Sequence, residues 1–384
     1  MVIIIGGNHH NTLGVIRSLG RVGIPPYVIL TSGNETSFVL KSKYIQGKSV
    51  VNGSDEAIRL LLSKFAFPRQ RAVVIACHDE ISSALDVNRD KLLPYFVIPG
   101  SNIPGRITKF MNKQRMGELA SQVGLTVPVT TVLNKFSVKE KGDLHYPCIT
   151  KPIDSKSGSK SEISVCNNIQ ELESFLNGTK EVKDYIIQQF IVKDFEFQLI
   201  GCSLEGGAEI IIPGVSIIIR QSKTSNTGFL HYRELDNSFT DTVEKAKLFI
   251  RTVGYSGLFS VEFLRDKSGK DFFMEMNYRN DGNTISVFNA GVNLPYIWFL
   301  NGIGADYQKE VKDLHEEYVM PEFAELALYQ QGLISRKEWK QDMEKATSYM
   351  DFAPDDPAPT DGWRKFHKQK TLSLLRRLKH KLFD

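Results

Sequence analysis

The sequence predicts an α/β lobe at the N-terminus, followed by a larger α+β region. Short apolar runs alternate with helical stretches through the first hundred residues, which is typical of βαβ units around a parallel sheet. Four strong strand candidates, FEFQLIG, EIIIPGVSIIIR, GLFSVEFLR and DFFMEMN, lie between residues 195 and 277. The stretch PGSNIPGRIT (99–108) carries two prolines and two glycines and predicts a connector between the two regions.

The N-terminal lobe is expected to be Rossmann-like. Its predicted elements are the strand VIIIG (2–6), a helix from Thr12 to Gly23, the strand PYVIL (26–30), a helix from Asp55 to Phe65, and the strand AVVIAC (72–77). Gly6 and Gly7 permit a tight turn into a helix N-terminus, which suits an anion, but they are equally compatible with simple turn glycines. Because the spacing is not G-x-G-x-x-G, a dinucleotide site is only weakly indicated.

Polar residues follow the AVVIAC strand at its carboxyl end. Open α/β sheets often bind ligands at this edge, so His78, Asp79 and Glu80 are candidates for the substrate side of a site. A surface turn is an equally good interpretation of these three residues.

Composition excludes several classes of protein. A chain of 384 residues with 41% hydrophobic residues can bury more than one core, and its formal net charge of +4 is too small to indicate nucleic acid as the main partner. The four cysteines contain no C-x-x-C pair, so neither a disulfide framework nor a zinc site is expected. The start MVIIIGGN predicts a buried strand rather than a signal peptide, and no run reaches the roughly 18 apolar residues of a spanning helix. We therefore expect a soluble, cytoplasmic protein.

The middle of the chain predicts a helix from Lys109 to Val123, with Gly124 at its C-terminus. Residues 130–190 mix strands with YPCITKP and the polar loop DSKSGSKSE. Further on, the turn signal DKSG (266–269) separates GLFSVEFLR from DFFMEMN and predicts an antiparallel hairpin.

The C-terminal part differs in character. FAPDDPAPTDG (352–362) predicts a linker, and KTLSLLRRLKHKLF (370–383) predicts a cationic amphipathic helix. Both an anionic membrane surface and the protein's own body are compatible with the apolar stripe of this helix.

Two acidic residues and an amide lie on the predicted hairpin. Glu262 and Glu275 come from its two arms, and Asn277 follows Glu275 on the same strand face. Mg²⁺ prefers carboxylate and amide oxygens together with substrate phosphates, so the three residues are candidate metal ligands. Taken alone, they are also compatible with the solvent face of an edge hairpin.

Basic and polar residues indicate a polyphosphate partner. Lys151 precedes a Ser/Gly-rich loop containing Ser157 and Gly158, whose backbone N–H groups and hydroxyls suit phosphate oxygens. A mobile polar turn is the alternative for this loop. In YIIQQFIVKDFEF (185–197), Gln188 and Gln189 end a strand and suit an adenine edge, and Glu196 suits ribose hydroxyls.

The order of these pieces resembles the ATP-grasp superfamily. The ordered set is NKQRMGELASQVGLTVP, YPCITKP with its loop, YIIQQFI with a downstream Glu, GLFSVEFL and FFMEMNYR. The resemblance runs from residue 1 to about residue 325 and is closest to the carboxylate–amine ligase branch, which includes D-aspartate ligases and carbamoyl-phosphate-synthase-like proteins. It implies a Rossmann-like domain over 1–108, an ATP-grasp domain over 109–325 with two α+β subdomains that clasp ATP and a lid at about 126–190, and a C-terminal extension over 326–384.

The resemblance also implies roles for individual residues. Lys113 and Lys151 match ATP-phosphate lysines, Gln188 and Gln189 stand near the adenine contact, and Glu196 matches the ribose-binding acid. Glu262, Glu275 and Asn277 match the magnesium ligands, Arg279 matches the arginine of E-x-N-P-R, and Arg220 resembles an arginine that faces the acceptor substrate. Two departures are Tyr278 in place of the usual proline and Gln189 in place of a common glutamate, and the loop has only one glycine, Gly158.

The implied reaction uses ATP and Mg²⁺ or Mn²⁺. A carboxylate attacks the γ-phosphorus to give an acyl phosphate, and an amine then displaces phosphate. The expected partners are a small-molecule carboxylate and a small-molecule amine, and no nucleic acid is expected to bind. A second copy of the chain is a further expected partner, since dimers are frequent in the family. Two alternatives stay open: an inactive ATP-binding or scaffold protein, and a membrane-associated ligase or adaptor of envelope or glycan assembly that binds the inner face of the membrane through residues 370–383.

Overall fold

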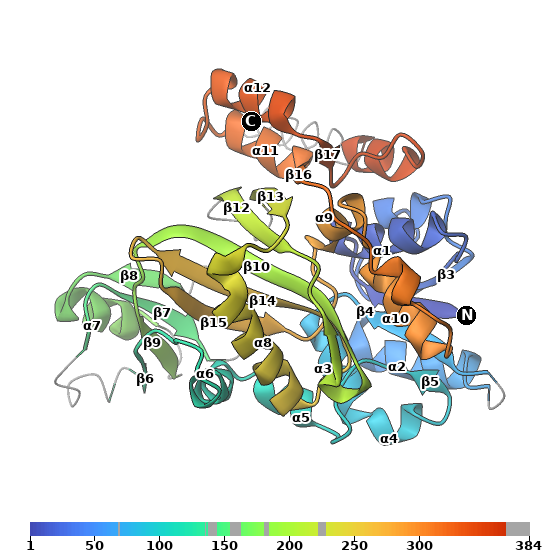
Figure 1. Ribbon diagram of the computed structural model, residues 1–384, viewed down its shortest axis with the longest axis horizontal. Helices are drawn as coiled ribbons and strands as arrows, with labels where there is room; N and C mark the ends of the chain where they lie inside the picture. The colour runs from blue at the N-terminus through green and yellow to red at the C-terminus, as the bar shows by residue number, and fades with distance from the viewer. Residues whose placement is uncertain are drawn as a thin grey trace, which may run out of the picture.

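The computed structural model describes residues 1–67, 70–134, 136, 144–153, 163–179, 184–221 and 228–365. Within these residues, the N-terminal lobe, drawn in blue in Figure 1, contains a parallel sheet. Within the same residues, this sheet has five strands in the order β3-β2-β1-β4-β5. The strands are β1 (Val2–Gly6), β2 (Tyr27–Leu30), β3 (Gly47–Val50), β4 (Ala72–Ala76) and β5 (Phe96–Val97). The helices are α1 (His10–Gly20), α2 (Gly53–Lys64), α3 (Asp79–Val87) and α4 (Arg89–Leu92), with a 3-10 turn η1 (Phe38–Lys41).

Both faces of this sheet are buried, which explains why its strands are continuous apolar runs. Successive side chains of a strand point to opposite faces. Val2 and Ile4 of β1 accordingly belong to a cluster that includes α1, whereas Ile3 and Ile5 belong to a cluster that includes α2 and α3. The predicted α/β lobe is confirmed.

A larger sheet forms the centre of the molecule. In the described part of the chain its order is β15-β14-β10-β12-β13-β16-β17, with β11 beside β10. Its strands are β10 (Lys193–Leu204), β11 (Glu209–Ile211), β12 (Val215–Gln221), β13 (Gly228–Arg233), β14 (Gly257–Asp266), β15 (Asp271–Asn277), β16 (Glu317–Met320) and β17 (Ser348–Tyr349). Helix α8 (Thr240–Val253) packs on one face through Phe249 and Ile250, which share a cluster with Phe197 and Phe259. Short 3-10 turns, η4 (Glu205–Gly207) and η5 (Asn237–Phe239), flank these elements.

Strands β14 and β15 form the predicted antiparallel hairpin. Asp266 stabilises the turn because its Oδ1 accepts hydrogen bonds from the backbone N–H groups of Ser268 (2.9 Å) and Lys270 (3.0 Å). Gly269 supplies the left-handed conformation that the turn requires, with a φ of +86°.

A separate antiparallel sheet, here called the lid sheet, has the order β6-β9-β7-β8. It comprises β6 (Thr130–Leu133), β7 (Cys148–Pro152), β8 (Ser164–Cys166) and β9 (Tyr185–Gln189). Helix α7 (Ile169–Asn177) covers it, and Leu172 and Leu176 share a buried cluster with Tyr185 and Ile187. These strands fall within residues 126–190, the range predicted for the lid.

Two helices, α5 (Arg106–Phe110) and α6 (Lys113–Gln122), replace the single helix predicted from Lys109 to Val123. The break occurs because Asn112 has an extended backbone and its side chain caps α6 by accepting a hydrogen bond from Arg115 N at 3.1 Å. Lys113 is thereby the first residue of a helix. At the other end Gly124, with a φ of +85°, follows the helix as predicted.

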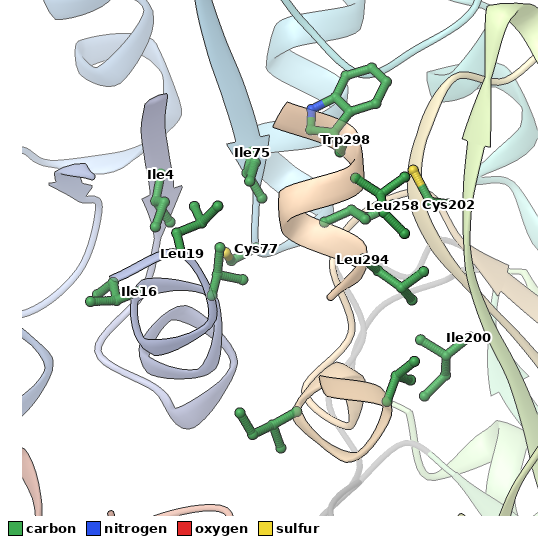
Figure 2. Close-up of a cluster of buried hydrophobic side chains, with 14 of the residues drawn as sticks. Ile4, Ile16, Leu19, Ile75, Cys77, Ile200, Cys202, Leu258, Leu294 and Trp298 are labelled. Atoms are coloured by element: carbon green, nitrogen blue, oxygen red, sulfur yellow. The ribbon is translucent and has the colours of Figure 1, made fainter. Parts of the chain in front are cut away.

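The N-terminal lobe and the central sheet share one hydrophobic core (Figure 2). Helix α10 (Leu294–Gly302), which follows α9 (Thr284–Asn289), lies between them and contributes Leu294 and Trp298. The indole of Trp298 donates a hydrogen bond to the backbone oxygen of Val74 in β4 at 3.1 Å. This shared core holds the N-terminal lobe against the base of the central sheet.

The C-terminal extension also packs against the rest of the protein. After η6 (Gln308–Glu310) and β16 come α11 (Glu322–Gln330) and α12 (Arg336–Lys345). Residues 352–362, predicted as a linker, are instead docked on the N-terminal lobe: Arg17 Nε lies 3.1 Å from Asp356 Oδ2, and both side chains are at most 2% exposed. The predicted helix 370–383 lies outside the described residues. No helix among the described residues combines the length and apolar character needed to cross a bilayer.

Candidate functional site

A cavity of about 1220 Å³ lies where the lid sheet, α6 and the β14–β15 hairpin face one another. The structure brings most of the predicted site residues to its wall: Lys113, Lys151, Gln188, Gln189, Glu196, Glu262, Glu275, Asn277 and Arg279. They come from distant parts of the sequence: the lid sheet, α6, the β14–β15 hairpin, strand β10 and the segment that follows β15. Asp79, at the start of α3, lines it from the N-terminal lobe.

Sheet register explains how the two acidic residues meet. Glu262 of β14 lies directly opposite Glu275 of β15, and Ser260 lies opposite Asn277. Burial, followed by the charge of Glu275, raises the pKa of Glu262 well above its usual value. The pKa of Glu275 is lowered, chiefly by the charge of Lys113. The pair therefore combines one carboxyl with a lowered pKa, Glu275, and one that resists ionisation, Glu262.

The two lysines differ in environment. Lys113 Nζ lies 3.2 Å from Glu275 Oε2, and the charge of Glu275 raises the pKa of this lysine. Lys151 Nζ donates a hydrogen bond to Gln188 Oε1 at 3.0 Å. Burial, together with the charge of Lys113, lowers the pKa of Lys151 to about 8. A phosphate group placed between the two ammonium groups would offset both their desolvation and their mutual repulsion.

Arg279 connects the hairpin to the N-terminal lobe. Its Nε lies 3.2 Å from Asp79 Oδ1, its Nη1 lies 3.3 Å from Asp281 Oδ2, and its Nη2 donates to Asn277 Oδ1 at 3.1 Å. Burial alone would lower the pKa of Arg279, but these carboxylates outweigh it and raise the pKa. The guanidinium is thus a fixed cation at the end of the cavity nearest the N-terminal lobe.

The opposite part of the cavity is suited to a flat apolar group. Gln189 N donates to Val129 O at 2.8 Å, and Val129 N donates to Gln189 Oε1 at 3.4 Å, so the main chain is fixed here. The amide of Gln188 is shared between Lys151 and Thr130 Oγ1, to which its Nε2 donates at 3.1 Å. Apolar side chains complete this wall: Val127, Val129, Ile149, Ile186, Phe190, Ile191, Phe273 and Met274. Glu196 lies nearby, paired with Lys193 at 2.7 Å.

The oxygen atoms of the hairpin fit a hard divalent cation. Asn277 Nδ2 and Gln198 Nε2 both donate to Oε1 of Glu262, at 3.0 and 3.3 Å, and no hydrogen bond among the described residues uses Oε2. The described residues contain no group of three or more His, Cys, Asp or Glu side chains that could hold a metal. A cation bound by Glu262, Glu275 and Asn277 would therefore complete its coordination with phosphate or water oxygens, as Mg²⁺ commonly does.

Among the described site residues that were predicted, Arg220 is the one that does not line the cavity. Ser157 and Gly158 lie outside the described residues. Arg220 forms ion pairs with Glu325 of α11, at 2.8 Å, and with Asp342 of α12, and it does not line the cavity. The physical reason is that two helices at the C-terminal end supply carboxylates to this guanidinium: Glu325 of α11 lies at the limit of the resemblance, and Asp342 of α12 lies in the C-terminal extension beyond it.

Sequence reasoning missed a buried polar layer beneath the cavity, formed by Gln198, Ser260, Asp281 and Asn283. A signal for Gln198 was present: it stands two residues after Glu196 on one strand, so both side chains share a face. Nothing in the sequence indicated which residue of β14 would face it.

The fold is that of known enzymes. The structure superposes on an N5-carboxyaminoimidazole ribonucleotide synthetase in complex with ADP, with a TM-score of 0.64 and 15% identity over 86% of this chain and 85% of that one. It also superposes on the L-amino acid ligase of Bacillus licheniformis, with a TM-score of 0.63 and 15% identity over 83% of this chain and 79% of the ligase. The chain has the ATP-grasp fold. The fold that the ordered motifs implied is confirmed.

Curated proteins with similar sequences have this ATP-grasp fold as well. The formate-dependent phosphoribosylglycinamide formyltransferase of Prochlorococcus marinus (strain MIT 9312) is 26% identical over 191 residues, 48% of each chain. The enzyme of the same name from a Nitratiruptor species is 24% identical over 247 residues, 58% of this chain and 60% of that protein. The chain thus matches about half the length of these ATP-grasp relatives. No family model matches it.

Proposed function

We propose that the protein is an ATP- and Mg²⁺-dependent ligase that activates a carboxylate as an acyl phosphate and joins it to an amine, releasing ADP and phosphate. The observation that carries this proposal is the cross-strand pair of Glu262 and Glu275, which faces the same cavity as Lys113 and Lys151. Carboxylates beside lysines in one cavity suit a metal-bound polyphosphate.

Each part of the cavity has a task in such a reaction. The apolar wall around Phe190 and Ile191 would hold the adenine, with Gln188 and Gln189 at its edge, and Glu196 would accept hydrogen bonds from the ribose. Lys113 and Lys151 would bind the phosphates. Phosphoryl transfer asks a protein mainly for alignment and charge stabilisation, and these residues supply both.

Glu262, Glu275 and Asn277 would hold Mg²⁺ or Mn²⁺, which would neutralise charge on the β- and γ-phosphates. Lys113 would then form its ion pair with a phosphate oxygen instead of with Glu275. Arg279 lies at the end of the cavity nearest Asp79, where it would stabilise charge on the transferring phosphoryl group and on the adduct formed with the amine.

The acceptor substrates would bind near the N-terminal lobe. The carboxyl ends of the parallel strands β1 and β4 lead into His9 and His78, and burial lowers the pKa of both imidazoles. Neutral imidazoles beside the Arg279 guanidinium suit small polar substrates. We also propose that the protein forms a homodimer and lies in the cytoplasm. No observation on the described residues supports contact with a membrane.

The test is an ADP-release assay with MgATP over a panel of small carboxylates paired with amines, with Glu275→Gln as the control. We expect ADP release that needs both substrates and that the control lacks. An inactive ATP-binding protein would bind MgATP in calorimetry but release no ADP with any pair. Absence of MgATP binding would contradict both interpretations.

A further inference from the structure

A buried amide, Gln198, lies beneath the carboxylate pair and does not line the cavity. In sheet register, Gln198 of β10 lies directly opposite Glu262 of β14, which in turn lies opposite Glu275 of β15. The three side chains therefore form one row across three neighbouring strands. Residues paired in this way lie close enough to interact directly.

Hydrogen bonding fixes the orientation of this amide. Gln198 Nε2 donates to Glu262 Oε1 at 3.3 Å, and Asn283 Nδ2 donates to Gln198 Oε1 at 2.7 Å. Glu262 Oε1 also accepts a hydrogen bond from Asn277 Nδ2, so Gln198 presents its NH₂ group to this oxygen and its carbonyl to Asn283. Asn283 is itself held because its backbone N–H donates to Asp281 Oδ1 at 2.9 Å.

We propose that Gln198 is a positioning residue that holds Glu262 with Oε2 directed to the metal. The inference rests on the proposed function, since it assigns a role toward the cation of that site. Gln198 shares Oε1 with the amide of Asn277, at 3.0 Å, so both donors engage the same oxygen and leave the other one for a cation.

The chemistry of an amide suits this role. A lysine or arginine at position 198 would neutralise Glu262 and compete with the cation, whereas an apolar residue would leave Asn277 as the one remaining described donor to Glu262 Oε1. An amide donates a hydrogen bond without adding charge. Partners that orient metal ligands typically change metal affinity by about 10- to 100-fold when they are removed.

The experiment measures Mn²⁺ binding to the full chain in the presence of ADP, by electron paramagnetic resonance of free Mn²⁺. Gln198→Met keeps the length of the side chain and removes the donor, and we expect the Mn²⁺ affinity to fall about tenfold. The affinity for ADP in EDTA should stay within about twofold of that of the unmodified chain, because Gln198 does not line the cavity. A general loosening of the fold would weaken the binding of both Mn²⁺ and ADP.

Ser216→Ala is the matched control, since Ser216 is the buried neighbour of Gln198 on its other side, in β12. Its Mn²⁺ affinity should equal that of the unmodified chain. Asn283→Ala is the second variant, for use if Gln198→Met does not fold. It releases the carbonyl end of the amide, and we expect a smaller loss of Mn²⁺ affinity.

Glu275→Gln distinguishes failure of the proposed metal site from failure of the proposed role of Gln198. If the unmodified chain binds Mn²⁺ with ADP and Glu275→Gln does not, the metal site is supported. In that case, unchanged Mn²⁺ affinity in both Gln198→Met and Asn283→Ala would overturn the role of Gln198 alone. If the unmodified chain binds no Mn²⁺, the metal site and the positioning role are both overturned.

Discussion

Lys113 Nζ lies 3.2 Å from Glu275 Oε2, which joins the first residue of helix α6 to the last strand of the hairpin across the wall of the cavity. The charge of Lys113 is the main reason that the pKa of Glu275 is lowered. Glu275 is therefore the ionised member of the carboxylate pair, and the consequences of removing its charge can be stated in advance.

Glu275→Gln should leave the fold intact and lower ATP-dependent phosphate release by at least about 100-fold. Loss of a residue that only orients a metal ligand costs up to about 100-fold, and Glu275 is proposed as a ligand itself. Gln keeps the size of the side chain but is a poor ligand for Mg²⁺. Phosphate release and circular dichroism would be measured on the same samples. Turnover equal to that of the unmodified chain would remove Glu275 from the metal site.

Lys151→Ala should weaken MgATP binding by roughly 10- to 100-fold, because a hydrogen bond to a charged group contributes about 1.5–3 kcal/mol. Isothermal titration calorimetry would measure the affinity. Lys247→Ala is the control, since Lys247 pairs with Glu244 on the outside of α8 and should not affect binding. Equal affinities for the two variants would contradict the role of Lys151.

Nucleotide binding should depend on pH through Lys151, whose pKa burial lowers to about 8. Phosphate favours the protonated amine, so the pKa of Lys151 rises on binding. The affinity for MgATP should then be constant below pH 8 and fall above it, with proton uptake between about pH 8 and 9. Calorimetry at pH 8.5 in buffers of different ionisation enthalpy would detect the proton, and Lys151→Ala should show none.

Asp356→Ala should destabilise the protein by about 3–5 kcal/mol, because it leaves the Arg17 guanidinium buried without its partner. The neighbouring Asp355→Ala breaks the more exposed pair with Arg21 and should cost about 0–1 kcal/mol. Urea unfolding of both variants would compare the two free energies. Similar values would mean that the buried pair does not hold the extension in place.

The docked extension should loosen as the pH rises. Burial and the neighbouring Glu322 raise the pKa of Asp351 to about 8. A carboxyl whose folded pKa is raised contributes stability that is complete below its unfolded pKa of about 3.8 and is lost as pH rises through its folded value. The melting temperature should therefore fall more steeply between pH 6 and 8 in the unmodified chain than in Asp351→Asn. Parallel curves would contradict this.

Much of the fold and of the site could be predicted from the sequence, because local patterns carry that information. Apolar runs predicted the strands, and DKSG predicted the turn between β14 and β15, where Asp266 accepts the turn hydrogen bonds and Gly269 supplies the left-handed conformation. The order of the motifs along the chain indicated the ATP-grasp fold. Glu262, Glu275 and Asn277 were candidates because of their places on two neighbouring strands, and all three line the cavity.

Tertiary structure decided everything that depends on which strands and segments become neighbours. Arg220 pairs with Glu325 and Asp342 because the C-terminal helices pack over β12 and β13, and no local pattern encodes that contact. Similarly, Pro- and Asp-rich residues 352–362 are not a linker here because Asp356 finds a buried arginine on α1. The position of Gln198 beneath Glu262 follows from the register between β10 and β14, and register is a property of two strands together.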